Sequence, residues 1–202
     1  MKYCGFLTVA SLLMAGCATE MQNDLLLDYE KVEATTILDA PSSLPGTYSP
    51  QRRAVVARGE YLVELLGCGA CHTDGALIGD PDFERSLAGS QIGIAYANPL
   101  GDKNPGVIYP SNITPDEKTG IGDWTDEQIA NAVRSGIGRH GSRRLAWMPW
   151  SGYAKLSDDD TDAIVSYLRT IEAVKHRVPD EVEPGKAASY PFVYFGVYRS
   201  KR

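Results

Sequence analysis

The sequence has few cysteines and histidines, the usual ligands of structural zinc, and it has no excess of positive charge. Its 202 residues include only four cysteines and three histidines, whereas a structural zinc site needs four such ligands at a familiar spacing. Lysine and arginine number 20 against 26 aspartates and glutamates, which gives a net charge of −6. That balance argues against nucleic acid as a partner, because phosphate binding needs a basic surface. A partner with a neutral or cationic docking surface is favoured instead.

Long hydrophobic runs are scarce at the N-terminus too. The apolar stretch at residues 5–14 is too short to span a bilayer and is followed by small residues, which predicts a signal peptide over residues 1–16. The run Leu13-Met14-Ala15-Gly16-Cys17 is also similar to the lipobox of bacterial lipoproteins. We therefore expect a lipid on Cys17 and a location on the periplasmic side of a bacterial membrane, with the outer membrane slightly favoured. The alternative is an ordinary signal peptide that contains a cysteine.

The rest of the chain is organised as a tether followed by one loop-rich domain. Residues 17–53 are mixed in polarity and collect prolines toward their end, which predicts a lipid-anchored tether. Apolar residues then recur at helical spacing over residues 54–66 until Gly67 ends the run, so a helix is expected to lead into Cys68. Residues 73–123 are rich in glycine, proline and asparagine and show neither period, which predicts long loops.

Two further helices carry start signals. A Thr-x-x-Gln capping box begins at Thr125, and a Ser-x-x-Asp box begins at Ser157, before an apolar face that predicts a helix of roughly 15 residues. No alternation of strands and helices and no internal repeat is visible. The pattern predicts one domain over residues 54–178, with residues 179–202 as an aromatic C-terminal tail. That tail either docks on a partner or folds back over its own domain.

The feature that points to a function is a C-x-x-C-H motif formed by Cys68, Gly69, Ala70, Cys71 and His72. This is the attachment signature of c-type haem. Two thiols three positions apart on a helical turn can add across the two vinyl groups of one porphyrin, and the adjoining histidine is then held beneath the iron. A secretory signal fits this interpretation, because bacterial haem c is attached outside the cytoplasm. The motif therefore predicts one covalent haem c.

The cysteine pair also has three alternative roles. A thioredoxin-type redox pair belongs in a βαβ setting, which the sequence does not predict. A structural zinc site would need four ligands at a familiar spacing, and beyond the two cysteines only His72, His140 and His176 remain. A plain disulfide between Cys68 and Cys71 is compatible with an oxidising compartment.

The second axial ligand of the iron follows by elimination, since cytochromes commonly place methionine or histidine opposite the proximal histidine. Among the four methionines, Met148 is the one that lies in the domain, in a loop between two predicted helices and before a stiffening proline. The alternative role for Met148 is to fill a gap in the core. His140 is the second candidate ligand, and His176 is expected to be a solvated histidine beyond the last helix.

Several longer runs resemble the c-type cytochrome domains in the cytochrome subunits of membrane-bound bacterial alcohol and gluconate dehydrogenases. The resemblance covers roughly residues 54–171 and is carried by Arg58-Gly59-Glu60-Tyr61-Leu62, Cys68-Gly69-Ala70-Cys71-His72-Thr73, Asn112-Ile113-Thr114-Pro115-Asp116, Thr119-Gly120-Ile121-Gly122-Asp123-Trp124-Thr125, Met148-Pro149 and Tyr153-Ala154-Lys155-Leu156. It implies an all-α cytochrome c fold, with helices around one haem and long loops covering it. It also implies that Met148 is the distal ligand and that the protein serves respiratory electron transfer.

The expected function is therefore that of an electron carrier and not of an enzyme. The dehydrogenase subunits usually carry three haem domains, whereas this chain has one haem motif, so a free-standing monohaem lipoprotein is expected. Its partners would be redox proteins: a dehydrogenase, a quinol oxidoreductase or a terminal oxidase. Asn112, Arg144 and Tyr153 are candidate contacts for the haem propionates. The alternative function is a five-coordinate haem enzyme of peroxidase type, or a gas sensor, which would require Met148 to be unligated.

Overall fold

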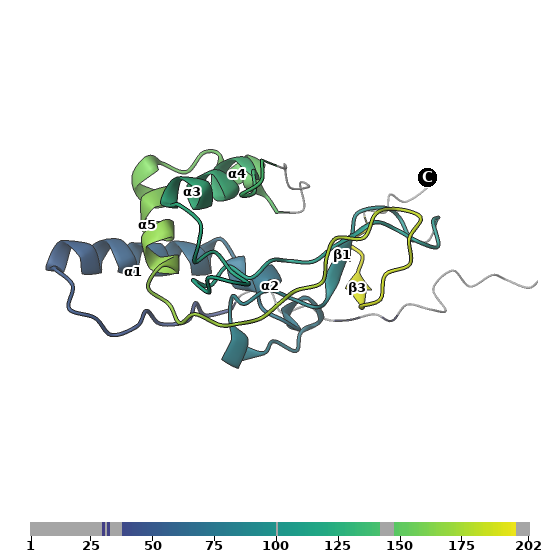
Figure 1. The fold of residues 1–202 in the computed structure, drawn as a ribbon, viewed down its shortest axis with the longest axis horizontal. Coiled ribbons are helices and arrows are strands. Elements are labelled where there is room, and N and C mark those ends of the chain that lie inside the picture. Colours follow the sequence, from purple (N-terminus) through teal and green to yellow (C-terminus); the bar gives the residue numbers. More distant parts are fainter. Residues whose placement is uncertain (1–29, 31, 33–37, 100, 142–147, 197–202) are drawn as a thin grey trace, which may run out of the picture. The chain divides into compact units, whose positions relative to one another are not determined.

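A computed structural model gives the fold of residues 30, 32, 38–99, 101–141 and 148–196 (Figure 1). All of these except residue 30 belong to one compact unit, Lys31–Arg202. In chain order its elements are α1 (Pro50–Leu65), α2 (Cys68–His72), the 3-10 helices η1 (Ala76–Ile78) and η2 (Phe83–Arg85), β1 (Gly93–Ala95), β2 (Val107–Ile108), α3 (Asp126–Ser135), α4 (Trp150–Tyr153), α5 (Asp158–Leu168) and β3 (Phe192–Val193). The helices agree with the expected fold, whereas the three strands mean that it is not purely α.

Helix α1 begins at Pro50, earlier than the apolar spacing predicts. Ser49 is its N-cap, and the Ser49 hydroxyl accepts a hydrogen bond from the backbone N–H of Arg52 at 3.2 Å. Proline suits the first helical position, because its φ is already helical and it has no N–H that needs a partner. Pro50, which was expected to close the tether, therefore opens a helix.

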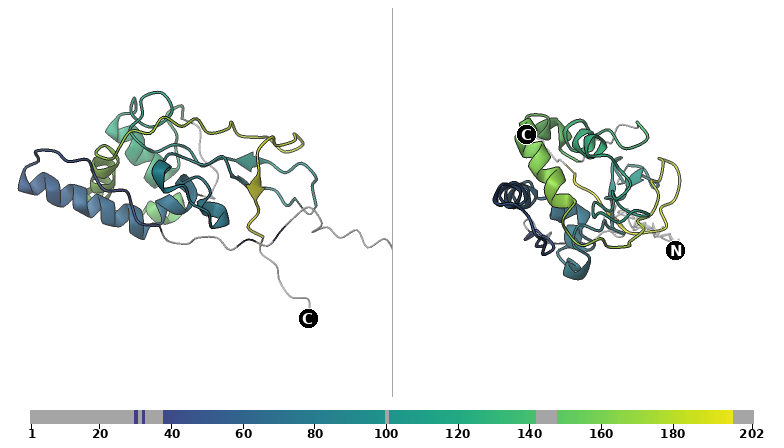
Figure 2. Two further views of the ribbon diagram at one scale, coloured as in Figure 1. Left: turned by 90° about the horizontal axis from the view of Figure 1, so that it is seen from below. Right: turned by 60° about the vertical axis from the view of Figure 1, so that its left-hand side comes forward.

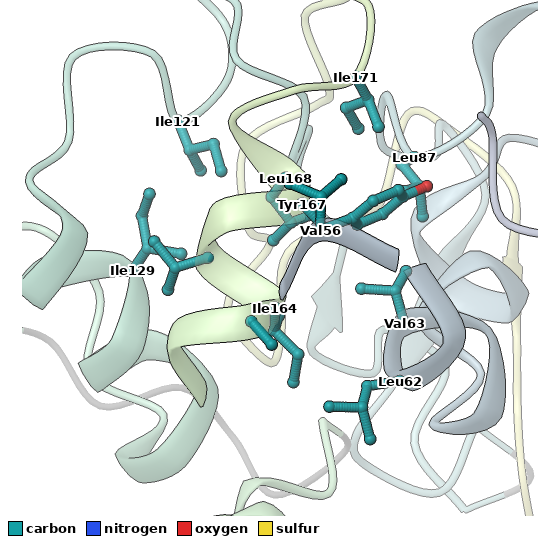
Figure 3. Close-up of a cluster of buried hydrophobic side chains, with 12 residues drawn as sticks. Val56, Leu62, Val63, Leu87, Ile121, Ile129, Ile164, Tyr167, Leu168 and Ile171 are labelled. Carbon is teal, nitrogen blue, oxygen red and sulfur yellow. The ribbon is translucent and has the colours of Figure 1, made fainter. Parts of the chain in front are cut away.

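The packing of α1 against α5 organises the core. A Cβ placed on Gly59 of α1 would lie 2.0 Å from the carbonyl oxygen of Ala163 and 2.6 Å from the Cβ of Tyr167, both in α5. Glycine is thus required for the two backbones to approach this closely. Around this crossing lies a cluster of buried apolar side chains, of which Figure 3 labels Val56, Leu62, Val63, Leu87, Ile121, Ile129, Ile164, Tyr167, Leu168 and Ile171.

The two predicted helix starts are both present, with different details. The capping box at Thr125 is complete, with both of its reciprocal hydrogen bonds formed. At α5 the hydroxyl of Ser157 accepts from the backbone N–H of Asp160, but the Asp160 carboxylate binds Arg58 of α1 at 2.9 Å. The Arg58 guanidinium lowers the pKa of Asp160. Helix α5 has 11 residues, so it is shorter than predicted.

A small sheet corrects the expectation of an all-α fold. Its strand order is β2-β1-β3. In the antiparallel pair of β1 and β2, Ile94 lies opposite Ile108, and in the parallel pair of β1 and β3 it lies opposite Val193. Strands of two or three residues are too short to show the alternating pattern by which a strand is recognised in a sequence. The parallel partner of β1 also comes from a distant part of the chain, at Phe192–Val193.

The C-terminal segment folds back on the domain, which was one of the two expected alternatives. Val182 and Val107 exchange two backbone hydrogen bonds of 2.8 Å each, and the Tyr109 hydroxyl donates to the carbonyl of Tyr190 at 3.3 Å. In Figure 2 the yellow C-terminal segment accordingly runs beside the teal strands. Residues 179–196 therefore share contacts with the loop that carries β1 and β2.

Part of the predicted tether also packs against the domain. Leu38 is 7% exposed, the hydroxyl of Tyr167 donates to the carbonyl of Pro41, and the N–H of Leu44 donates to the carbonyl of Thr170 at 2.7 Å. Cys17 and the predicted signal peptide lie outside the described residues. Among the helices that the structure does describe, none has the length and apolar character needed to cross a membrane.

Candidate haem-attachment site

The C-x-x-C-H motif forms a helical turn of its own. Helix α1 ends at Leu65, Gly67 takes up a left-handed conformation with φ of 68°, and α2 then runs over Cys68–His72. The chain thus leaves α1 through a bend that favours glycine. Cys68 and Cys71 stand three positions apart on this turn, so both thiols lie on one side of it, as attachment to one porphyrin requires.

Both thiols are free and partly buried. Burial raises the pKa of Cys68 to about 12, with a further contribution from the neighbouring Cys71, and burial also raises the pKa of Cys71. A catalytic redox cysteine needs a lowered pKa, because the thiolate is the nucleophile. The pKa values of Cys68 and Cys71 are raised instead. In addition, the element that precedes them is a helix and not the strand of a βαβ unit.

The structure does not support a zinc site either. Within the described ranges, no three histidine, cysteine, aspartate or glutamate side chains come close enough together to hold a metal ion. His140 is exposed, beside the tight turn that Gly141 forms with Gly138 through a hydrogen bond of 2.9 Å. His176 lies elsewhere and is buried.

His72 is oriented by a backbone acceptor. Its Nδ1 lies 2.7 Å from the carbonyl oxygen of Ser111. Because a carbonyl can only accept, Nδ1 carries the proton, and the lone pair of the ring is then on Nε2. Histidines that ligate metals are commonly held in this way, since the second hydrogen bond fixes both the tautomer and the ring. His72 therefore has the tautomer that an iron ligand requires.

The C-terminal end of α4 contacts the residue pair that precedes the motif. The Tyr153 hydroxyl in α4 donates to the carbonyl of Leu66 at 2.9 Å, just before the motif. Burial, together with the nearby Cys68 and Cys71, raises the pKa of Tyr153 to about 12. Met148 is half-buried and precedes α4 by two residues, with its carbonyl accepting from Trp150 N–H at 2.7 Å.

The remaining predicted site residues differ in their surroundings. Arg144 lies outside the described residues. Asn112 is 2% exposed, and its amide is engaged with other protein groups. His176 was expected to be solvated, and this is wrong: it is 7% exposed, and its Nδ1 donates to the carbonyl of Ala88 at 2.9 Å. Ser111 was not predicted at all, because a backbone carbonyl has no sequence signature.

The C-x-x-C-H turn carries an oriented histidine and follows a helix that crosses the last helix of the domain. Together these features define the site of a haem c protein. Residues 56–172, more than half of the chain, match the family described as Cytochrome c. The chain belongs to the cytochrome c family, whose haem is covalently bound. Membership of this family supports a role in electron transfer.

Proteins similar to this chain are named as cytochrome subunits of dehydrogenases. The fructose dehydrogenase cytochrome subunit of Gluconobacter japonicus is 34% identical over 87% of this chain and 31% of its own length. The cytochrome c subunit of the quinone-dependent alcohol dehydrogenase of Gluconobacter oxydans is 38% identical over 63% of this chain and 24% of its own length. The corresponding values for the gluconate 2-dehydrogenase cytochrome c subunit of Pantoea cypripedii are 40%, 57% and 23%. The chain thus spans about a quarter to a third of these curated relatives.

Proposed function

We propose that this protein carries electrons on a single haem, with Cys68 and Cys71 as its thioether attachments and His72 and Met148 as the axial ligands. The observation that carries the proposal is the hydrogen bond of 2.7 Å from His72 Nδ1 to the Ser111 carbonyl, inside a C-x-x-C-H turn. It gives the histidine the orientation and tautomer of a ligand. The two cysteines then serve as attachment points.

Some of these side chains would hold the haem, and others would set its reduction potential. Haem supplies an iron that takes up and returns one electron. Cys68 and Cys71 anchor it on one side of α2, and His72 donates the Nε2 lone pair. Met148 supplies the soft thioether that stabilises the ferrous state and raises the reduction potential. A histidine and methionine pair leaves no open position for a substrate, which suits electron transfer without bond chemistry.

Apolar packing around α4 supports the placement of Met148. Trp150 lies against the end of α3, where a Cβ on Gly136 would be 2.6 Å from the indole ring. Gly136 has φ of 63°, so glycine is favoured here both by the backbone and by the space. The indole helps to fix the segment after Met148. A fixed setting of the ligand keeps a reduction potential well defined.

We infer that the partners are redox proteins on the extracytoplasmic side of a bacterial membrane. The three relatives are named as dehydrogenase subunits, which supports a dehydrogenase as the electron donor. A quinol oxidoreductase or a terminal oxidase would then take the electrons onward. A lipid on Cys17 would hold the carrier at the membrane where such partners work.

The covalent attachment is tested by acid–acetone extraction of the purified protein. One haem per chain should stay with the polypeptide, because thioether bonds survive this treatment. The double variant Cys68→Ser/Cys71→Ser is the matched control, and any haem that it binds should pass into the acetone. Haem that extracts freely from the wild-type protein would refute the proposed attachment.

A further inference from the structure

The acceptor of the His72 hydrogen bond is a backbone carbonyl, so its position depends on the path of the chain around Ser111. Two backbone hydrogen bonds of 2.9 Å tie this region to residues 87–90: Ser90 N to Pro110 O and Ile113 N to Leu87 O. A third, of 2.8 Å from Gly89 N to His72 O, ties the same residues to the histidine turn. The loop at residues 87–90 therefore touches both the histidine turn and the segment that orients it. Further support for this segment comes from residues 174–176, a third part of the chain.

Asn112, the next residue, supplies that support. Its Nδ2 donates to the carbonyl of Val174 at 2.8 Å and to the Thr119 hydroxyl at 3.1 Å, and its Oδ1 accepts from the N–H of Thr114 at 2.9 Å. Because a carbonyl only accepts and a backbone N–H only donates, these partners define the orientation of the amide. Both ends of the amide are thus engaged within the protein.

The segment that Asn112 holds is fixed at further points by His176. Its Nδ1 donates to the carbonyl of Ala88 at 2.9 Å, and its backbone N–H donates to the Thr119 hydroxyl at 3.1 Å. The Nε2 of Gln91 lies 3.4 Å from the His176 Nε2, which accepts from it. Residues 87–91, 111–119 and 174–176 are thereby joined in one hydrogen-bonded unit, which we call the Asn112 network.

We propose that Asn112 is a positioning residue for His72. Its buried amide fixes the Ser111 carbonyl, and this carbonyl sets the strength of the hydrogen bond from His72 Nδ1 and, with it, the reduction potential. The inference rests on the proposed role of His72 as an iron ligand. It goes beyond that role by assigning a part of the tuning to a side chain that does not reach the cofactor.

The sign of the effect follows from the basicity of the ligand. A hydrogen bond from Nδ1 to a carbonyl makes Nε2 a stronger donor, which favours the ferric state. When the Ser111 carbonyl is no longer held in place, this bond weakens. The reduction potential should then rise, and the Nδ1 proton should exchange faster with solvent. A merely structural role of Asn112 would lower stability and produce neither change.

The experiment compares Asn112→Ala with Thr170→Val in the haem-loaded full chain. Thr170 is also buried, at 5% exposed, and its hydroxyl donates to the carbonyl of Tyr167 at 2.8 Å, so its loss removes a hydrogen bond outside the Asn112 network. NMR of ferrous protein labelled with ¹⁵N-histidine gives the exchange rate of the His72 Nδ1 proton, and a redox titration gives the potential. Asn112→Ala should speed exchange about tenfold, as expected for a weakened hydrogen bond, and raise the potential. Thr170→Val should change neither.

A milder pair of variants keeps the test decisive if Asn112→Ala does not fold. Thr119→Val removes the hydroxyl that accepts from Asn112 and from the backbone of His176, whereas Thr119→Ser keeps it. Thr119→Val should show a smaller increase in the exchange rate of the His72 Nδ1 proton and in the reduction potential. Thr119→Ser should behave as the wild type does. Unchanged proton exchange and potential in Asn112→Ala, or in Thr119→Val if the former does not fold, overturn the positioning role. Wild-type protein without histidine-bound iron would overturn the proposed function itself.

Discussion

At the scale of single residues, Met148 separates an electron carrier from a haem enzyme. Its thioether is the proposed second axial ligand, on a segment that precedes α4, whose C-terminal end contacts the residue pair before the attachment motif. Met148→Ala should abolish the weak far-red absorption of ferric, thioether-bound iron, lower the reduction potential and open the iron to carbon monoxide. Absorption spectra of the ferric protein and of the ferrous protein under carbon monoxide, with a redox titration, measure all three effects.

His140→Ala is the control for the Met148 prediction. His140 is exposed, and as the competing candidate ligand it should leave the spectrum and the potential unchanged when it is removed. If wild-type protein binds carbon monoxide readily, or if His140→Ala alters the spectrum, the His/Met assignment is wrong. A five-coordinate haem enzyme or gas sensor would then fit the site better than an electron carrier does.

Residue types could be predicted where the chemistry needs a particular side chain at a particular spacing. The cysteine pair and His72 are of this kind, and the structure places them on one helical turn. Ser111 acts through its backbone, so its side chain leaves no signal in the sequence. His176 has neighbours of ordinary type and finds its acceptor 88 positions away, at Ala88, which is why its burial was not predicted.

At the scale of elements, the crossing of α1 and α5 predicts that alanine lowers stability at one glycine, Gly59, and not at another, Gly152. In Gly59→Ala the new methyl group would meet the Ala163 carbonyl oxygen at 2.0 Å, so the two helices must move apart. We expect this overpacking to lower the free energy of unfolding by about 3 kcal/mol. Denaturant unfolding followed by circular dichroism provides the measurement.

Gly152→Ala is the matched control for the helix crossing. Gly152 lies in α4, and a Cβ built there has no atom within 4 Å. The substitution should therefore be neutral or stabilise the protein by about 0.5 kcal/mol, since it reduces the freedom of the unfolded chain. Equal effects of the two substitutions would show that α1 and α5 do not approach as closely as described.

A helix or strand could be predicted when the residues that define it are neighbours in the sequence. The start of α3 was predicted because the residues of its capping box are neighbours in the sequence. The start of α1 was missed, because Pro50 punctuates loops as readily as it begins helices. The sheet was missed because β1 pairs with a strand of two residues near the other end of the domain.

At the scale of the whole molecule, the lipid predicted on Cys17 decides where the protein resides. Cys17→Ser should release the carrier from the membrane fraction, because a lipid chain contributes about 0.8 kcal/mol for each buried CH₂ and several chains hold almost permanently. Cell fractionation followed by detection of the haem-bearing chain measures the distribution.

Cys4→Ser serves as the control for Cys17→Ser, since Cys4 lies inside the predicted signal peptide and is not the lipobox cysteine. This variant should fractionate with membranes as the wild type does. The anchor hypothesis fails if Cys17→Ser also remains with the membranes to the same extent.

The Asn112 network also bears on how fast the histidine site forms during folding. The hydrogen bond from Asn112 to Val174 joins residues 62 positions apart, whereas α1 and the α2 turn form from neighbours in the sequence. Closing a long loop costs conformational entropy before any contact compensates for it, so distant pairings form slowly. We therefore expect the histidine turn to form before its orienting carbonyl is secured. On this expectation, the rate at which residues 174–176 dock sets how soon a newly folded chain reaches its final potential.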